Sequence, residues 1–94
     1  MKYYETVMGI LARRSGYTEA EILGGRGEAC ADVRSILVAL LLRKYANYEI
    51  VLMTGLSRQA VSRISAQHGD RAKHKYSMAM EMREVEHELA AMAE

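Results

Sequence analysis

Apolar residues along this chain recur at steps of three and four, the period of an α-helix that buries one face. The first such stripe is Tyr3, Tyr4, Val7, Met8 and Leu11, and it predicts a helix that ends near residue 15. Continued along the chain, the pattern predicts six helices, the later five being a short one after Thr18 and others over about residues 29–45, 47–53, 57–68 and the tail from residue 70. The stripe within residues 29–45 is the widest, which marks that helix as the central buried one.

Short-range signals mark several of the expected helix ends. Thr18 and Glu21 form a capping-box pattern, in which a hydroxyl and a carboxylate accept hydrogen bonds from free backbone N–H groups. Asn47 and Ser57 are placed to cap the helices that follow them. Gly69 is placed to end the helix that begins at residue 57.

The tail carries a heptad pattern, with apolar side chains at steps of four, three, four and three. These residues are Met78, Met82, Val85, Leu89 and Met92. Less than three heptads is short for an independent coiled coil, so the seam packs either against its own domain or against a second copy. We therefore expect two parts, residues 1–75 as the main domain and residues 76–94 as an acidic amphipathic helix that packs on it or forms a homodimer through residues 78–92.

Composition supports one small all-α domain. The 94 residues are 50% hydrophobic and include no proline, so the chain can bury a core without an obligatory helix break. Cys30 is the single cysteine and no cleavable signal segment precedes the first helix, which favours a reducing cytoplasm. The longest apolar run, residues 36–42, is far shorter than the roughly 20 residues that a membrane-spanning helix needs. We expect no membrane association.

Charge divides the chain at residue 75. Residues 1–75 carry a formal charge of +5 and residues 76–94 carry −4, although the total is only +1. A basic body permits an anionic partner such as nucleic acid if the basic side chains share one face.

Residues 48–64 have the apolar spacing of a helix-turn-helix around Gly55. The side chains expected to face inward are Ile50, Val51, Leu56, Val61 and Ile64. Around the second helix this leaves Gln59, Ser62, Arg63 and Ala66 outward, with Arg58 and Ser65 beside them. In a helix-turn-helix the second helix enters the major groove while the first crosses the backbone.

The outward residue types match the chemistry of the groove. Arg can donate two hydrogen bonds to guanine, Gln can pair with adenine, and basic side chains attract phosphates. These rules assign base contacts to Arg58, Gln59, Ser62 and Arg63, and backbone contacts to Ser57, Arg71, Lys73 and Lys75. The alternative is an ordinary solvated face.

Together these segments resemble the C-terminal DNA-binding domain, domain IV, of the bacterial chromosomal replication initiator DnaA. The similar parts are Leu11-Ala12, residues 18–24, Arg26, residues 34–40 and the helix-turn-helix that ends at Ile64. The resemblance implies a Trp-repressor-like helical fold on duplex DNA. It also implies that Arg26, in a glycine-rich loop over residues 24–28, reaches the minor groove and that Arg34 helps to hold the backbone.

This chain departs from that family in two ways. The family's base-contacting signature contains an Asp-His pair that is absent from Thr54-Gly-Leu-Ser-Arg-Gln-Ala-Val61, which argues against the initiator's own DNA box as the target. The sequence also has no Gly-x-x-x-x-Gly-Lys-Ser/Thr phosphate loop, so ATP-driven opening of an origin is excluded for this chain.

Other candidate chemistry is weak. His68, His74 and His87 are not spaced for a shared metal site, and Cys30 has no neighbouring partner for nucleophilic catalysis. The glutamates of the tail suit a solvated face. We therefore expect no catalysis, no cofactor, no metal and no small-molecule substrate. The leading hypothesis is a detached, non-enzymatic duplex-DNA-binding module, and the alternative is a protein-interaction module that uses the heptad helix and Met80.

Overall fold

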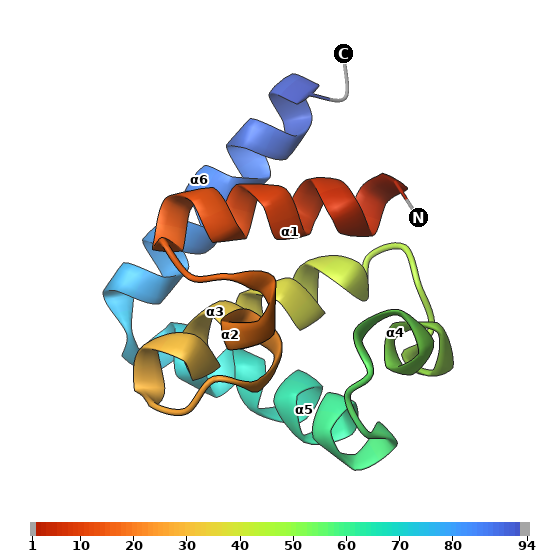
Figure 1. The fold of residues 1–94 in the computed structure, drawn as a ribbon. Coiled ribbons are helices and arrows are strands. Elements are labelled where there is room, and N and C mark those ends of the chain that lie inside the picture. The colour runs from red at the N-terminus through yellow and green to blue at the C-terminus, as the bar shows by residue number, and fades with distance from the viewer. Residues whose placement is uncertain (1, 93–94) are drawn as a thin grey trace.

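In the computed structural model, which describes residues 2–92 except for the side chains of residues 71, 72 and 74, every regular element is a helix (Figure 1). The six helices are α1 (Lys2–Ser15), α2 (Glu19–Gly24), α3 (Glu28–Leu41), α4 (Asn47–Thr54), α5 (Arg58–His74) and α6 (Tyr76–Met92). The expected all-α class and the number of helices are confirmed.

Helix α3 lies at the centre of the bundle. It contacts α1 and α2 on one side and α5 on another, and its residues Ile36, Leu37, Val38, Leu40 and Leu41 are at most 2% exposed. Val7 and Leu11 of α1 pack into the same core. Because α3 separates α1 from the α4–α5 pair, the helix-turn-helix occupies the opposite side of the bundle from α1 (Figure 1).

Helix α6 packs on its own domain. It contacts α1 and α5, Met78 and Val85 are buried, and Met82 and Leu89 are partly buried against the core. Met92, the last residue of the heptad seam, is 63% exposed. Four of the five seam positions are thus used within the chain.

Several expected boundaries were wrong. The helix expected to end at Tyr45 ends at Leu41, and Ala46 rather than Asn47 is the N-cap residue of α4. Ala46 has no side-chain acceptor, and its backbone N–H instead donates to Oε1 of Glu49 at 2.9 Å.

The largest error concerns α5, which continues through Gly69 to His74, so that the last helix begins at Tyr76 and not at residue 70. An interior glycine costs a helix only about 1 kcal/mol relative to alanine. Packing of α5 against α3, α4 and α6 offsets that cost.

Candidate nucleic-acid interface

A tight three-residue turn joins α4 to α5. Gly55 adopts a left-handed conformation with φ of 76°, and its N–H donates to the Val51 carbonyl at 3.0 Å. Thr54 braces the turn from inside, because its hydroxyl donates to the Ile50 carbonyl at 2.7 Å and accepts from the Leu56 N–H at 3.1 Å. The sequence correctly identified the glycine but gave no signal for these bonds of Thr54.

The expected cap of α5 is confirmed, since Ser57 Oγ accepts a hydrogen bond from the Ala60 N–H at 3.0 Å. The inner side of the motif is also as expected. Ile50 and Val61 are fully buried, and Val51, Leu56 and Ile64 are partly buried against the core.

Toward the carboxyl end of α5, His68 links the inner face of this helix to α3. Its Nδ1 lies 2.9 Å from the hydroxyl oxygen of Ser35, a buried residue of α3. Burial lowers the pKa of His68, and the positive charge of Arg43 lowers it further. The contact with Ser35 ties α5 to α3. Among the residues described, no group of three His, Cys, Asp or Glu residues could hold a metal ion.

The four side chains expected to contact bases share the solvent-facing side of α5. Arg58, Gln59, Ser62 and Arg63 are all exposed, as are Ser65 and Ala66 beside them. Within the part of the chain that the structure describes, neither Arg58 nor Arg63 forms an ion pair. The positive charge of this face is therefore available to an outside partner.

Arg34 has a different environment from an exposed phosphate-binding arginine. Its Nε donates to the Ile22 carbonyl at 2.8 Å and its Nη2 donates to the Gly25 carbonyl at 2.6 Å. The guanidinium thus closes the carboxyl end of α2 and holds the following loop, where Arg26 is exposed. No sequence pattern indicated that Arg34 would brace this loop.

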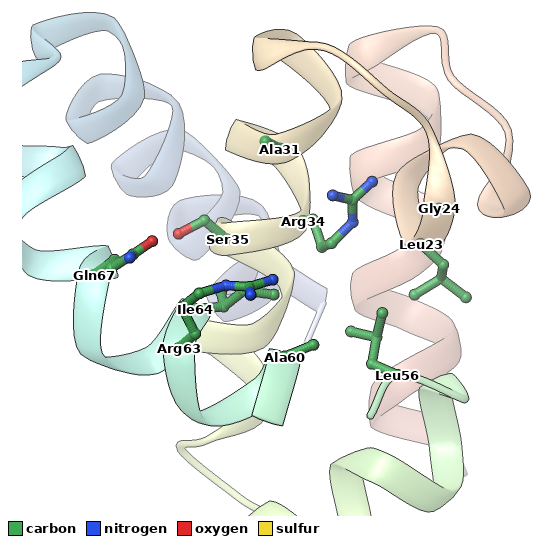
Figure 2. Close-up of a pocket in the computed structure, with 10 residues that line it drawn as sticks. All are labelled: Leu23, Gly24, Ala31, Arg34, Ser35, Leu56, Ala60, Arg63, Ile64 and Gln67. Carbon is green, nitrogen blue, oxygen red and sulfur yellow. The ribbon is translucent and has the colours of Figure 1, made fainter. Parts of the chain in front are cut away.

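Arg34 and Arg63 line the same cleft, which has a volume of about 230 Å³ and lies between α2, α3 and α5 (Figure 2). Leu23, Ala31, Leu56, Ala60 and Ile64 give it an apolar surface, and Ser35 and Gln67 are its other polar side chains. Because three separate helices build it, no local sequence pattern could have revealed this cleft.

The three basic residues near the carboxyl end of α5, Arg71, Lys73 and Lys75, do not share one environment. Lys73 is exposed. The Nζ atom of Lys75 lies 2.8 Å from Glu28 Oε1 and 3.1 Å from Asp32 Oδ2. Hydrogen bonds with these carboxylates raise the pKa of Lys75, that with Glu28 most. The side chain of Arg71 lies outside the described residues. Of this expected phosphate-binding group, Lys73 is thus exposed to solvent, whereas Lys75 is held against α3.

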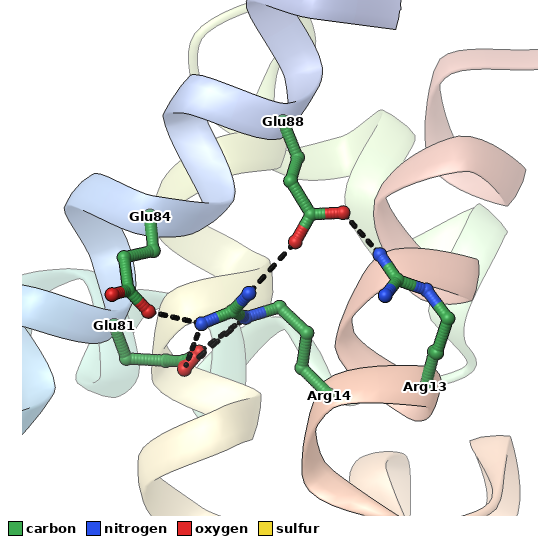
Figure 3. A network of polar contacts seen from close by, with 5 residues as sticks. All are labelled: Arg13, Arg14, Glu81, Glu84 and Glu88. Atoms are coloured by element: carbon green, nitrogen blue, oxygen red, sulfur yellow. Dashed lines mark hydrogen bonds and ion pairs between the residues drawn. The ribbon is translucent and has the colours of Figure 1, made fainter.

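Among the described residues, the acidic side chains of α6 pair with α1 and with the segment that follows α3. Arg14 forms ion pairs with Glu81, Glu84 and Glu88, and Arg13 also pairs with Glu88 (Figure 3). These bonds raise the pKa of Arg14, and the hydrogen bond from Arg14 is the main cause of the lowered pKa of Glu88. In the segment that follows α3, Arg43 Nη1 lies 2.8 Å from Glu86 Oε2.

This pairing explains the uneven charge of the sequence. The negative tail neutralises arginines at the carboxyl end of α1 and beside the end of α3. Arg58 and Arg63 of α5, which have no ion pair among the described residues, remain as a separate basic face.

None of the described helices is long and apolar enough to cross a membrane. Comparisons of the chain with known protein families, with curated proteins and with solved structures found no match.

Proposed function

We propose that this chain binds double-stranded DNA through α4 and α5, as a non-enzymatic module similar to the DNA-binding domain of the replication initiator. One observation carries the proposal: in the second helix of a correctly capped helix-turn-helix, Arg58 and Arg63 are exposed and form no ion pair with any other residue that the structure describes. In this arrangement α5 enters the major groove and turns four side chains toward base edges, those of Arg58, Gln59, Ser62 and Arg63. Arg26, on an exposed loop, extends toward the adjacent minor groove.

The role can be regulatory or associated with replication, and a reducing cytoplasm fits the free, buried thiol of Cys30. The competing function is protein docking through α6. Exposed Met80 and Met92 are what supports it. It has less support than DNA binding, because the greater part of the heptad seam is already covered by the chain's own core.

The first test is selection of a preferred site from randomised duplexes, followed by titration of the protein with that site and with unrelated DNA. Arg58→Ala should weaken binding to the preferred site by about 1 to 3 kcal/mol and weaken binding to unrelated DNA less, if Arg58 makes a bidentate base contact. The matched control is Arg83→Ala, which removes one exposed positive charge from α6. Equal losses for the two variants would contradict a base contact by Arg58.

The two lysines after α5 give a second prediction. Lys73→Ala should weaken binding to every sequence and lower the slope of log K against log salt by about one, because Lys73 is exposed and one phosphate contact is lost. Lys75→Ala should leave that slope unchanged, because Glu28 and Asp32 already hold its ammonium group. Fluorescence anisotropy at several salt concentrations measures both slopes. A reduced slope for Lys75→Ala alone would reverse these assignments.

A further inference from the structure

A hollow lies between the first turns of α1, the last turns of α6 and the residues that follow α3. Its volume is about 570 Å³. We call it the end surface, and its lining residues are Lys2, Tyr3, Thr6, Lys44, Leu89 and Met92. Because α3 lies between α1 and α5 (Figure 1), the end surface is separate from the outward face of α5 that we assign to DNA.

The end surface is positively charged. Its lining includes two exposed lysines and no carboxylate. Neither Lys2 nor Lys44 forms an ion pair with another described residue. The Nζ atom of Lys44 instead lies 4.6 Å from the centroid of the Tyr3 ring, and this contact leaves its charge in place. The end surface therefore favours a partner that brings negative charge.

Tyr3 gives the end surface a fixed and uncharged wall. Its hydroxyl donates to the Leu40 carbonyl at 3.0 Å, and its ring lies against that of Tyr45 with the two centroids 6.0 Å apart. Burial raises the pKa of Tyr3, so its phenol stays neutral and does not cancel the charge of the lysines. The two ammonium groups thus lie beside a rigid aromatic ring.

The carboxyl end of α6 adds apolar area to the end surface. Leu89 is partly buried against the core, whereas Met92 is 63% exposed. The heptad seam of α6 therefore continues past the part that its own domain covers. A methionine side chain is flexible and adapts to apolar partners of different shapes. Exposed apolar area beside unpaired positive charge is typical of a surface that binds another protein.

We propose that the end surface docks an acidic amphipathic helix of a partner protein, whose apolar face covers Met92 and Leu89 while its carboxylates pair with the two lysines. A helix suits the site because the described residues form no strand edge to which an extended peptide could add. A second copy suits it less, since a two-fold contact centred here would bring the lysines of both copies together.

Duplex DNA also brings negative charge to such a surface, but it offers no apolar face for Met92. The docking adds to the proposed DNA binding and does not depend on it. With both surfaces in use, the module would connect a duplex to another protein.

The test titrates the full chain with a synthetic helix that has leucines along one face and glutamates on both sides of that face. The protein carries methyl-labelled methionine, so that NMR reports the surroundings of each of its seven methionines. We expect the Met92 signal to shift saturably, while the signal of Met80, another exposed methionine of α6, stays in place. The control peptide has Gln for every Glu and should bind more weakly, because it lacks the complementary charge.

Variants separate the charged contacts from the apolar one, with affinity measured by fluorescence anisotropy of the labelled peptide. Lys2→Gln and Lys44→Gln should each lower affinity roughly threefold at about 0.01 M salt and much less at about 1 M, because salt screens exposed charge pairs. Arg83→Gln is the charge-matched control on α6. Met92→Ser should lower affinity at every salt concentration, whereas Met80→Ser should not. Circular dichroism checks that every variant stays helical.

Several outcomes would overturn the proposal. No saturable binding of the acidic helix up to about 1 mM is the first. Equal losses for Lys44→Gln and Arg83→Gln, or for Met92→Ser and Met80→Ser, would place the peptide elsewhere. A shift of the Met92 signal with protein concentration alone would show that a second copy occupies the end surface.

Other probes test the remaining classes of partner. Binding to vesicles of anionic phospholipid, with none to the peptide, would identify the end surface as a lipid contact. Displacement of the peptide by duplex DNA would place nucleic acid there and would also overturn the proposal. Binding of the acidic helix by a protein that binds no duplex would instead overturn the proposed function and leave the docking intact.

Discussion

Ending the chain after Lys75 is expected to abolish cooperative folding. The deletion removes Met78 and Val85, which are 3% and 0% exposed, and uncovers the core that they contact. Burial of such side chains stabilises a fold by about 1.5 to 3 kcal/mol each, so these two account for roughly 3 to 6 kcal/mol of a typical total of 5 to 15. The arginines of α1 would also lose their partners on α6. Thermal melts followed by circular dichroism compare residues 1–75 with the full chain.

The matched control keeps the apolar face of α6 and removes its charge. Changing Glu81, Glu84 and Glu88 together to Gln should leave a cooperative transition at a lower Tm, because exposed ion pairs contribute much less than buried side chains. A cooperative melt for residues 1–75 at the Tm of the full chain would show that α6 does not stabilise the domain.

Features set by neighbouring residues were predictable from the sequence. Thr18 caps α2, Ser57 caps α5 and Gly55 takes the left-handed turn position, as expected, because each depends on atoms within three or four residues. The inward face of the helix-turn-helix was predictable for the same reason, since helical spacing alone decides which side chains share a face.

Features that depend on distant partners were not predictable. Lys75 looked like a free cation beside Lys73, yet its ammonium group pairs with Glu28 and Asp32 from another helix. Arg34 was placed on DNA by resemblance alone, whereas its first role in the fold is to close the end of α2. The net negative charge of the tail was likewise evident from the sequence, but its ion pairs with the arginines of α1 were not.

A substitution at Gly25, in the corner between α2 and α3, is expected to have the second large effect on stability. Gly25→Ala should destabilise the protein by about 1 to 3 kcal/mol, because the added Cβ would clash with the Glu21 carbonyl oxygen and lie 2.8 Å from Cys30 Sγ. Its φ of −65° is ordinary for any residue, so the penalty is steric. Each kcal/mol should lower Tm by about 4 to 8 °C in a domain of this size.

Adjacent Gly24 supplies the matched control. It belongs to α2 and a Cβ there would meet nothing within 4 Å, so Gly24→Ala should be neutral or stabilise by up to about 1 kcal/mol. Combining Gly25→Ala with Cys30→Ala separates the two contacts, since it removes the sulfur but leaves the backbone oxygen. Only partial recovery is expected, and full recovery would show that the backbone of α2 yields easily. Because the Gly25 carbonyl accepts from Arg34, a shift of this corner should also weaken duplex binding, since it displaces the loop that carries Arg26.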